Sequence, residues 1–174
     1  MSPETLILLS NLGRARRPRG AAIAHSEPVL SDPTTAREQL AALTSLPITE
    51  ADLPVLRRVH QLAVGAAESL LRGELPDCGA ITALADGSAA HIKLTATDSG
   101  LRGELAWSDN SISSSLARRL IEELAALEPN RLRCCARATC DLLFYDATRS
   151  RTRRWHAEDP CGWRERQRRR RAHH

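Results

Sequence analysis

The chain of 174 residues can hold one ordinary domain and a small appendage. Aromatic residues make up only 3% of it, and the apolar fraction consists mainly of Leu, Ala and Ile, which favours helices that pack through small side chains. Residues 131–174 contain thirteen Arg and five acidic residues, a net of +8; because the whole chain carries +4, residues 1–130 carry −4. No apolar stretch approaches the roughly 18–20 residues of a transmembrane helix, so we exclude a membrane protein and expect a soluble, cytoplasmic one.

Apolar spacing, capping residues and prolines predict several helices before residue 130. A short apolar element at Thr5–Leu9 precedes an irregular stretch, rich in Gly, Pro and Arg, over residues 11–30. The predicted helices are Pro33 to about Leu43, Thr49 or Asp52 to about Leu71, Asp77–Leu84, and Asn110 or Ser111 to just before Pro129. Cys78 has no other cysteine nearby and is expected to be a small buried hydrophobic residue.

One β-hairpin is predicted in the same part of the chain. Residues His91–Thr97 and Leu101–Trp107 flank the turn sequence Asp98-Ser99-Gly100, and apolar residues alternate along both segments. We therefore expect residues 1–130 to form an α+β domain that is mainly helical.

Four potential metal ligands lie near the C-terminus: Cys135, Cys140, His156 and Cys161, in the pattern C-x4-C-x15-H-x4-C. Two ligand pairs with this spacing are typical of a closed, tetrahedral zinc site. Four protein ligands leave no position for water, so one structural Zn²⁺ is expected and an enzyme is not. In a reducing cytoplasm the thiols would hold metal rather than form disulfides. Cys134 and Cys135 cannot both enter one tetrahedron, and the spacing alone leaves either one as a ligand.

Residues 131–174 contain too few apolar residues to fold without help. A bound zinc ion would stabilise such a unit by about 10–16 kcal/mol. Leu142–Tyr145 can form one strand of a short hairpin, and Asp159 with Pro160 can begin a helix that carries Cys161 in its first turn. The predicted shape resembles a treble clef, with a knuckle, a hairpin and then a helix.

The sequence RLRCCARATCDLLFYDATRSRTRRWHAEDPCGWR, residues 131–164, resembles the finger of the bacterial CGNR zinc finger family. That finger reads approximately R-L-R-x-C-A-x-x-x-C…F-x-D-x-S-x-x-x-S-R-R-W-C…C-G-N-R. The resemblance, specific over about residues 131–166, places Cys135, Cys140, His156 and Cys161 at the four ligand positions and Cys134 at a position that is not a ligand. His156 stands where the family usually has Cys, and Trp163 stands where it has the Asn of its name, whereas Arg164 is retained.

In this family the finger usually follows an α+β domain called ABATE, and members are described as stress-induced transcription regulators. Upstream, the likeness rests on Asn11-Leu12-Gly13, the order of the helices and the hairpin before the last helix. The resemblance therefore implies an ABATE-like domain over residues 1–130 and a CGNR-type finger with a basic C-terminal helix over residues 131–174.

The residues around the metal ligands are strongly basic and could neutralise phosphates, releasing counterions. Trp163 is a candidate for stacking on a base. Arg154 could instead be structural, paired with Asp141 or Asp146. The candidate nucleic-acid-binding residues are Arg149, Arg151, Arg153, Arg154, Trp163, Arg164, Arg166, Arg168, Arg169, Arg170 and Arg171.

These observations favour a DNA-binding transcription regulator whose first domain binds a small-molecule or protein effector. RNA binding is the nearest alternative, and a protein-interaction adaptor that docks its arginines on an acidic protein surface is an alternative of a different class. Reading of DNA half-sites would favour a homodimer.

Overall fold

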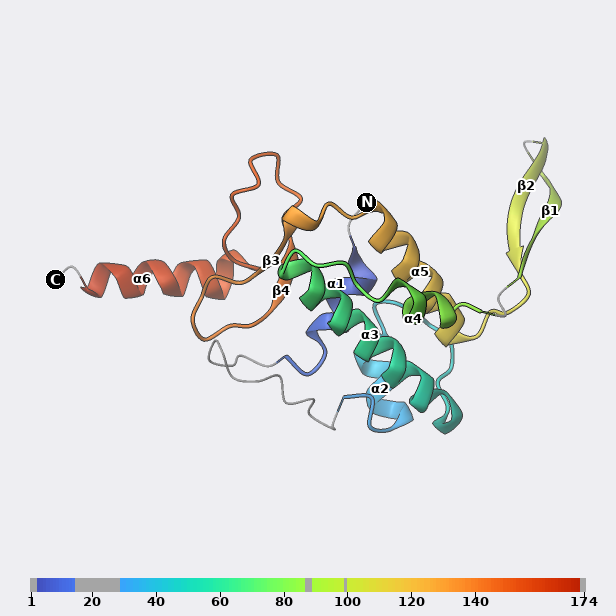
Figure 1. The fold of residues 1–174 in the computed structure, drawn as a ribbon, viewed down its shortest axis with the longest axis horizontal. Coiled ribbons are helices and arrows are strands. Elements are labelled where there is room, and N and C mark those ends of the chain that lie inside the picture. Colours follow the sequence, from blue (N-terminus) through green and yellow to red (C-terminus); the bar gives the residue numbers. More distant parts are fainter. Residues whose placement is uncertain (1–2, 15–28, 87–88, 99, 173–174) are drawn as a thin grey trace.

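Three packed helices form the centre of the computed structural model, which describes residues 3–14, 29–86, 89–98 and 100–172. Helix α1 (Glu4–Asn11) contacts both α3 (Leu53–Leu71) and α5 (Ile112–Ala126), as Figure 1 shows. Around them lie α2 (Pro33–Leu40), the 3-10 turn η1 (Glu50–Asp52) and α4 (Cys78–Ala83). No helix in these described ranges is both long and apolar enough to cross a membrane.

The hydrophobic core joins these helices to the C-terminal segment. Leu6 of α1, Leu56 of α3 and Leu120 of α5 are almost fully buried in it. Leu132 and Leu143, which come from the segment with the metal ligands, belong to the same core. Burial of apolar surface therefore stabilises both parts of the chain together.

Side-chain caps define where the helices begin. Asp32 accepts hydrogen bonds from the backbone N–H groups of Thr34 and Thr35, 3.0 and 2.9 Å away, at the start of α2. Hydrogen bonds from Thr35 are the main cause that lowers the pKa of Asp32 from 3.8 to about 2. Ser111 caps α5 in the same way. The predicted helices are confirmed, although α2 ends at Leu40, three residues before the predicted end.

The start of α1 is held by a buried carboxylate. Glu123 of α5 is 8% exposed and accepts hydrogen bonds from the N–H groups of Thr5 and Leu6, at 2.9 and 2.8 Å. The first amides of a helix have no partner within the helix and carry its partial positive charge. A carboxylate from α5 therefore satisfies them inside the core.

The predicted hairpin is confirmed as strands β1 (Ala90–Thr97) and β2 (Gly100–Trp107), which pair antiparallel. It projects from one side of the helical body (Figure 1). Its large apolar side chains are exposed.

The C-terminal segment begins with the 3-10 turn η2 (Pro129–Arg131). Strands β3 (Leu132–Cys134) and β4 (Leu143–Tyr145) then form a second antiparallel pair. The helical stretch η3 (Glu158–Gly162) leads into α6 (Trp163–Ala172), which projects from the side of the molecule opposite the β1–β2 hairpin (Figure 1). The α+β class is thus confirmed.

Cys78 is exposed rather than buried, because it lies in the first turn of the short helix α4, where its Sγ is 3.4 Å from the carbonyl oxygen of Pro76. Most of the predicted irregular stretch over residues 11–30 lies outside the described residues.

Candidate metal centre

The first two candidate ligands lie in the connection between β3 and β4. Cys135 follows β3 directly, and its N–H donates to the carbonyl oxygen of Leu142 at 2.9 Å, which extends the strand pairing by one step. The N–H of Cys140 donates to the carbonyl oxygen of Arg137 at 3.0 Å and closes a tight turn. The knuckle is therefore the turn of the β3–β4 hairpin, whereas the sequence predicted that the hairpin would follow it.

The second pair comes from the other end of the finger. His156 ends a long loop, and the guanidinium of Arg153 donates hydrogen bonds to the carbonyl oxygens of Trp155 and His156, which fixes the end of this loop. Asp159 has an extended backbone inside η3, so the continuous helix starts at Pro160, as the sequence predicted. Cys161 then lies in the first turn after this break, two residues before α6 begins at Trp163.

The fold brings these four side chains together. The ligand atoms of Cys135, Cys140, His156 and Cys161 all lie within 4.8 Å of one another. The Sγ of Cys140 is 3.5 Å from the Nδ1 of His156. A tetrahedral zinc ion with ordinary bond lengths separates a sulfur and a nitrogen ligand by about 3.6 Å, so this spacing fits.

Burial and ligand chemistry agree with this geometry. The three cysteines are at most 2% exposed and form a cluster of their own, with Leu142 and Trp155 packed against it. Burial raises the pKa of the Cys140 thiol to about 12 when only the protein surrounds it. A bound metal ion reverses that effect, because it deprotonates the thiols that it coordinates. The arrangement is that of one structural zinc site with three sulfurs and one nitrogen.

Cys134 does not belong to this group. It is half-buried at the end of β3, pairs with Leu143 across the strands, and packs against the main hydrophobic core. Adjacent residues of a strand point to opposite faces. Cys135 therefore faces the metal cluster while Cys134 faces the helices.

A buried carboxylate organises the loop between the two ligand pairs. Asp146 accepts hydrogen bonds from the N–H and hydroxyl groups of Thr148 and from the N–H of Arg153. These bonds, first of all the one from the Thr148 hydroxyl, lower the pKa of Asp146. The Nη1 of Arg131 donates to the carbonyl oxygens of Asp146 and Thr148, both at 3.0 Å. Sequence reasoning did not assign these positions to this role.

Three arginines of this loop, all predicted to bind nucleic acid, are engaged in side-chain contacts. Arg151 forms an ion pair with Glu128 at 2.7 Å. Arg153, besides its two carbonyl contacts, lies over the ring of Phe144 at 5.1 Å. Arg154 lies over the ring of Trp155 at 5.6 Å. The alternative pairing of Arg154 with Asp141 or Asp146 is not found among the described residues, where one Asp146 oxygen accepts from the N–H of Arg153 instead.

Helix α6 buries no residue. Within it, Glu165 forms ion pairs with Arg168 at 2.6 Å and with Arg169 at 3.7 Å. Arg166 pairs with Glu158 of η3. Trp163 is 51% exposed at the start of the helix, so its ring is open to solvent.

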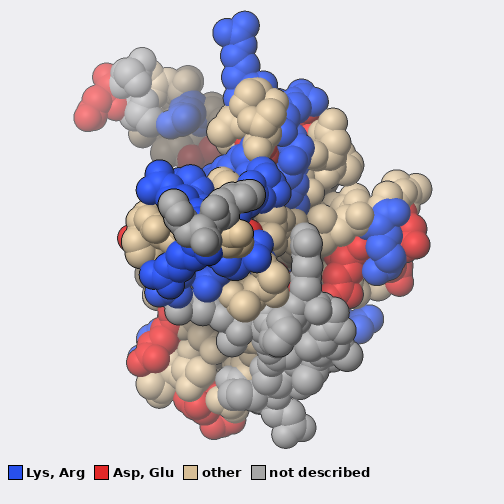
Figure 2. Space-filling model, turned by 90° about the vertical axis from the view of Figure 1, so that its left-hand side faces the viewer, with Lys and Arg blue, Asp and Glu red and all other residues tan. Residues whose placement is uncertain are grey.

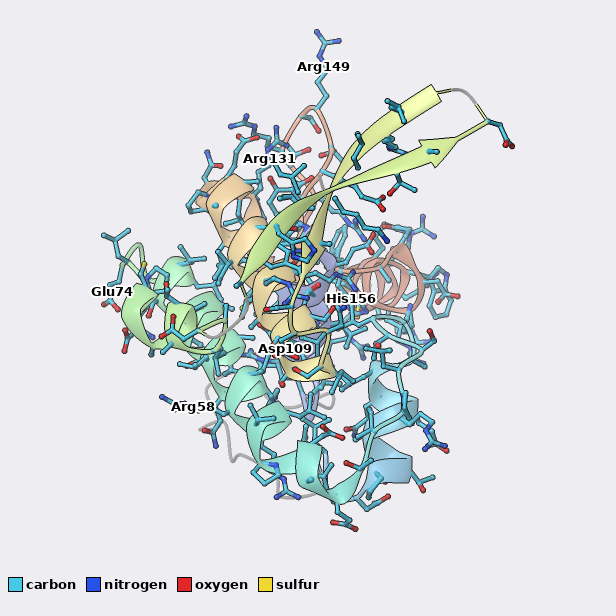
Figure 3. The ribbon with its side chains drawn as sticks, turned by 90° about the vertical axis from the view of Figure 1, so that its right-hand side faces the viewer. Arg58, Glu74, Asp109, Arg131, Arg149 and His156 are labelled. Atoms are coloured by element: carbon cyan, nitrogen blue, oxygen red, sulfur yellow. The ribbon has the colours of Figure 1, made fainter. Side chains whose placement is uncertain are left out.

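Four predicted arginines remain unengaged. Among the described residues they form no hydrogen bond or ion pair through their side chains: Arg149, Arg164, Arg170 and Arg171. Arg149 extends away from the body at the tip of the loop (Figure 3). Viewed from the α6 end, Lys and Arg side chains gather over one part of the surface (Figure 2). The zinc finger therefore presents guanidinium groups from both the loop and the helix.

The finger is also fastened to α1. The side-chain amide of Asn11 donates to the carbonyl oxygen of Leu143 at 2.9 Å and accepts from its N–H at 2.8 Å, as a neighbouring strand would. Arg14 donates to the carbonyl oxygen of Asp141 and pairs with Glu68 at 3.2 Å. The sequence carried no signal for these contacts beyond the polar Asn at the end of an apolar helix.

Comparison with known protein families identifies the segment that holds the metal cluster. The sequence profile described as CGNR zinc finger matches residues 131–174. No curated protein matches the chain at a significant level. The matched residues include all four members of the Cys3His cluster. Residues 131–174 of this chain are therefore a CGNR zinc finger.

Proposed function

We propose that this protein binds nucleic acid, preferentially duplex DNA, through arginines that its zinc finger displays, and that it acts in the cytoplasm as a transcription regulator rather than an enzyme. The observation that carries the proposal is the set of four unengaged arginines in the same segment as the metal cluster, a segment with a net charge of +8. Guanidinium groups without carboxylate partners are free to neutralise phosphates.

The charge arrangement predicts how the binding would depend on salt. Each phosphate contact lowers the slope of log K against log salt by about 0.9 on B-DNA, so four contacts would give a slope of about −3.6. Arginine–phosphate contacts position a protein without reading bases. We therefore expect little discrimination between duplex sequences from these residues alone.

The first experiment titrates the zinc-loaded protein with a short duplex DNA and a structured RNA over a series of salt concentrations. Tighter binding to DNA, with a steep negative slope, supports the proposal. Tighter binding to RNA would show that RNA, not DNA, is the ligand. If the affinity for both does not depend on salt, the proposal that the protein binds nucleic acid is wrong.

Substitution of the unengaged arginines tests whether they make the phosphate contacts. Arg149→Ala and the pair Arg170→Ala and Arg171→Ala should each weaken binding, and each lost phosphate contact should make the slope shallower by about 0.9. Arg58→Ala is the matched control, because Arg58 is an exposed arginine of α3 far from the finger (Figure 3). Equal effects of the control and the finger variants would show that general charge, not this surface, is responsible.

The effector part of the proposal rests on a groove of about 630 Å³ between α1 and the finger. Its lining includes Ile7 and Leu8 of α1, Phe144 of β4, and His156. A small apolar molecule there would touch the helical domain and a metal ligand at once. Its binding should raise the thermal unfolding midpoint, and Leu8→Trp, which fills the groove, should abolish that increase.

The adaptor alternative uses the same arginines on an acidic protein surface. Partners captured from a lysate after complete nuclease treatment would favour it, whereas loss of all partners on nuclease treatment would favour nucleic-acid binding.

A further inference from the structure

The β1–β2 hairpin exposes an unusually apolar face. Four of its large side chains are between 64% and 80% exposed: Ile92, Leu94, Leu101 and Leu105. The strand register places Ile92 opposite Leu105, Leu94 opposite Gly103, and Ala96 opposite Leu101. All six residues therefore lie on one face of the two-stranded sheet.

The charged residues of the hairpin lie on its other face. Lys93 is opposite Glu104 and Thr95 is opposite Arg102, and the Thr95 hydroxyl donates to Glu104 at 3.1 Å. The apolar face thus carries no charge. In a twofold contact each residue comes close to its own equivalent, so a charged face would meet like charge. A neutral face is the kind that can pair with a copy of itself.

An isolated two-stranded hairpin is marginally stable in water and usually needs a covering layer. Among the described residues, β1 and β2 pair only with each other, so no third strand supports them. Exposed apolar surface on a hairpin with free edges also favours association. Both properties indicate that the face is covered when the protein is in its working state.

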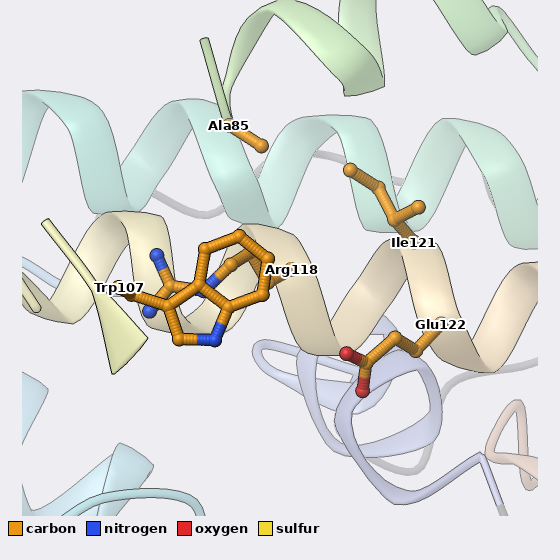
Figure 4. Close-up of a pocket in the computed structure, with 5 residues that line it drawn as sticks. All are labelled: Ala85, Trp107, Arg118, Ile121 and Glu122. Carbon is orange, nitrogen blue, oxygen red and sulfur yellow. The ribbon is translucent and has the colours of Figure 1, made fainter. Parts of the chain in front are cut away.

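The base of the hairpin is anchored, so its position is defined. The guanidinium of Arg118 in α5 lies 4.5 Å from the ring centroid of Trp107 at the end of β2, and its Nη1 donates to the carbonyl oxygen of Asp109 at 2.9 Å. Trp107 and Arg118 border a hollow of about 210 Å³ together with Ala85, Ile121 and Glu122, shown in Figure 4. This hollow is smaller than the roughly 300 Å³ of the smallest typical ligand pockets. We therefore interpret Trp107 and Arg118 as an anchor for the hairpin and not as part of a ligand pocket.

From these observations we infer that the apolar face of the hairpin is the contact surface of a homodimer, in which the β1–β2 hairpins of two copies pack face to face. Four side chains with roughly 120 Å² of exposed apolar surface each contribute about 500 Å² per copy, or about 1,000 Å² in total. That is close to the minimum of about 1,000 Å² for a biological interface and below the roughly 1,200 Å² of stable ones, so a weak, concentration-dependent dimer is expected. The hairpin and α6 project on opposite sides of the body, so the dimer leaves both fingers open.

The test is sedimentation velocity of the full-length, zinc-loaded protein over a range of micromolar concentrations. We expect a concentration-dependent dimer for the natural sequence. Leu94→Glu places a charge in the middle of the face and should weaken the dimer at least about tenfold. Leu94→Ala removes the side chain without adding a charge and should weaken it less.

The matched control is Arg102→Glu, which changes the charge of the same hairpin on its other face. It should leave the dimer intact. Zinc content and circular dichroism of each variant report whether the chain has folded. A natural protein that stays monomeric up to about 100 μM, or a dimer that Leu94→Glu leaves unchanged, overturns the inference. No nucleic acid is present, so the result is independent of the proposed function.

Discussion

At the scale of single residues, the two adjacent cysteines have different roles because their side chains point to opposite faces at the end of strand β3. Cys135 is fully buried in the metal cluster, whereas Cys134 faces the helical core. We expect Cys135→Ser to lower zinc affinity by at least about 100-fold and to leave the finger largely unfolded without metal. Cys134→Ser, the control, should retain one zinc per chain. Elemental analysis of the zinc bound after dialysis distinguishes the two variants. Equal loss of zinc in both would contradict the assignment of Cys135, and not Cys134, as the ligand.

A second residue whose effect can be predicted is Asp32, the cap of α2. Its pKa is about 2 in the folded chain against the ordinary 3.8, since Thr35 and its neighbours donate to the ionised carboxylate. The carboxylate therefore stabilises the fold above about pH 4, and that contribution is lost as the pH falls through about 2. Urea unfolding of the natural chain and of Asp32→Asn should differ most near pH 5 and converge toward pH 2. If the difference in unfolding free energy between the two chains stays constant from pH 5 to pH 2, the Asp32 carboxylate does not stabilise the fold in this way.

At the scale of elements, the finger docks on α1 through one amide. Asn11, which is half-buried, exchanges two hydrogen bonds with the backbone of Leu143, which is buried. Asn11→Ala would leave the N–H and carbonyl of Leu143 without these partners and should lower the free energy of unfolding by about 1–3 kcal/mol. Asn110→Ala removes an exposed amide before α5 and should have little effect. Similar losses in the two variants would show that Asn11 does not carry the docking.

At the scale of the whole molecule, the metal site and the helices are coupled through a shared core. Leu132 and Leu143 lie among the leucines of α1, α3 and α5, so the finger cannot unfold without exposing part of that core. Removing zinc with a chelator should therefore lower the thermal midpoint of the helical signal by several degrees, and adding zinc back should restore it. Circular dichroism at 222 nm, recorded during heating with and without zinc, measures this thermal midpoint. Helices that melt at an unchanged temperature without zinc would show that the two parts are independent.

Local patterns were sufficient for most of the elements. The three- and four-residue spacing predicted α3 and α5, the turn at Asp98-Ser99-Gly100 predicted the hairpin, and Asp32 and Ser111 predicted two helix starts. These features depend on residues close in sequence, so they can be read before the fold is known. Cys78 shows the limit, because its exposure depends on which side of a short helix faces the core.

Most of the secondary structure, the charge imbalance and, with the family resemblance, the ligand set of the zinc finger could be predicted from the amino-acid sequence. The tertiary structure was needed to show which arginines pair with Glu128, Glu158, Glu165 or backbone carbonyls and which remain unengaged. It also decided that Asn11 fastens the finger and that the apolar face of the hairpin is exposed. The physical reason is that hydrogen bonds, ion pairs and burial depend on contacts between residues far apart in sequence, 132 positions for Asn11 and Leu143, which local spacing does not encode.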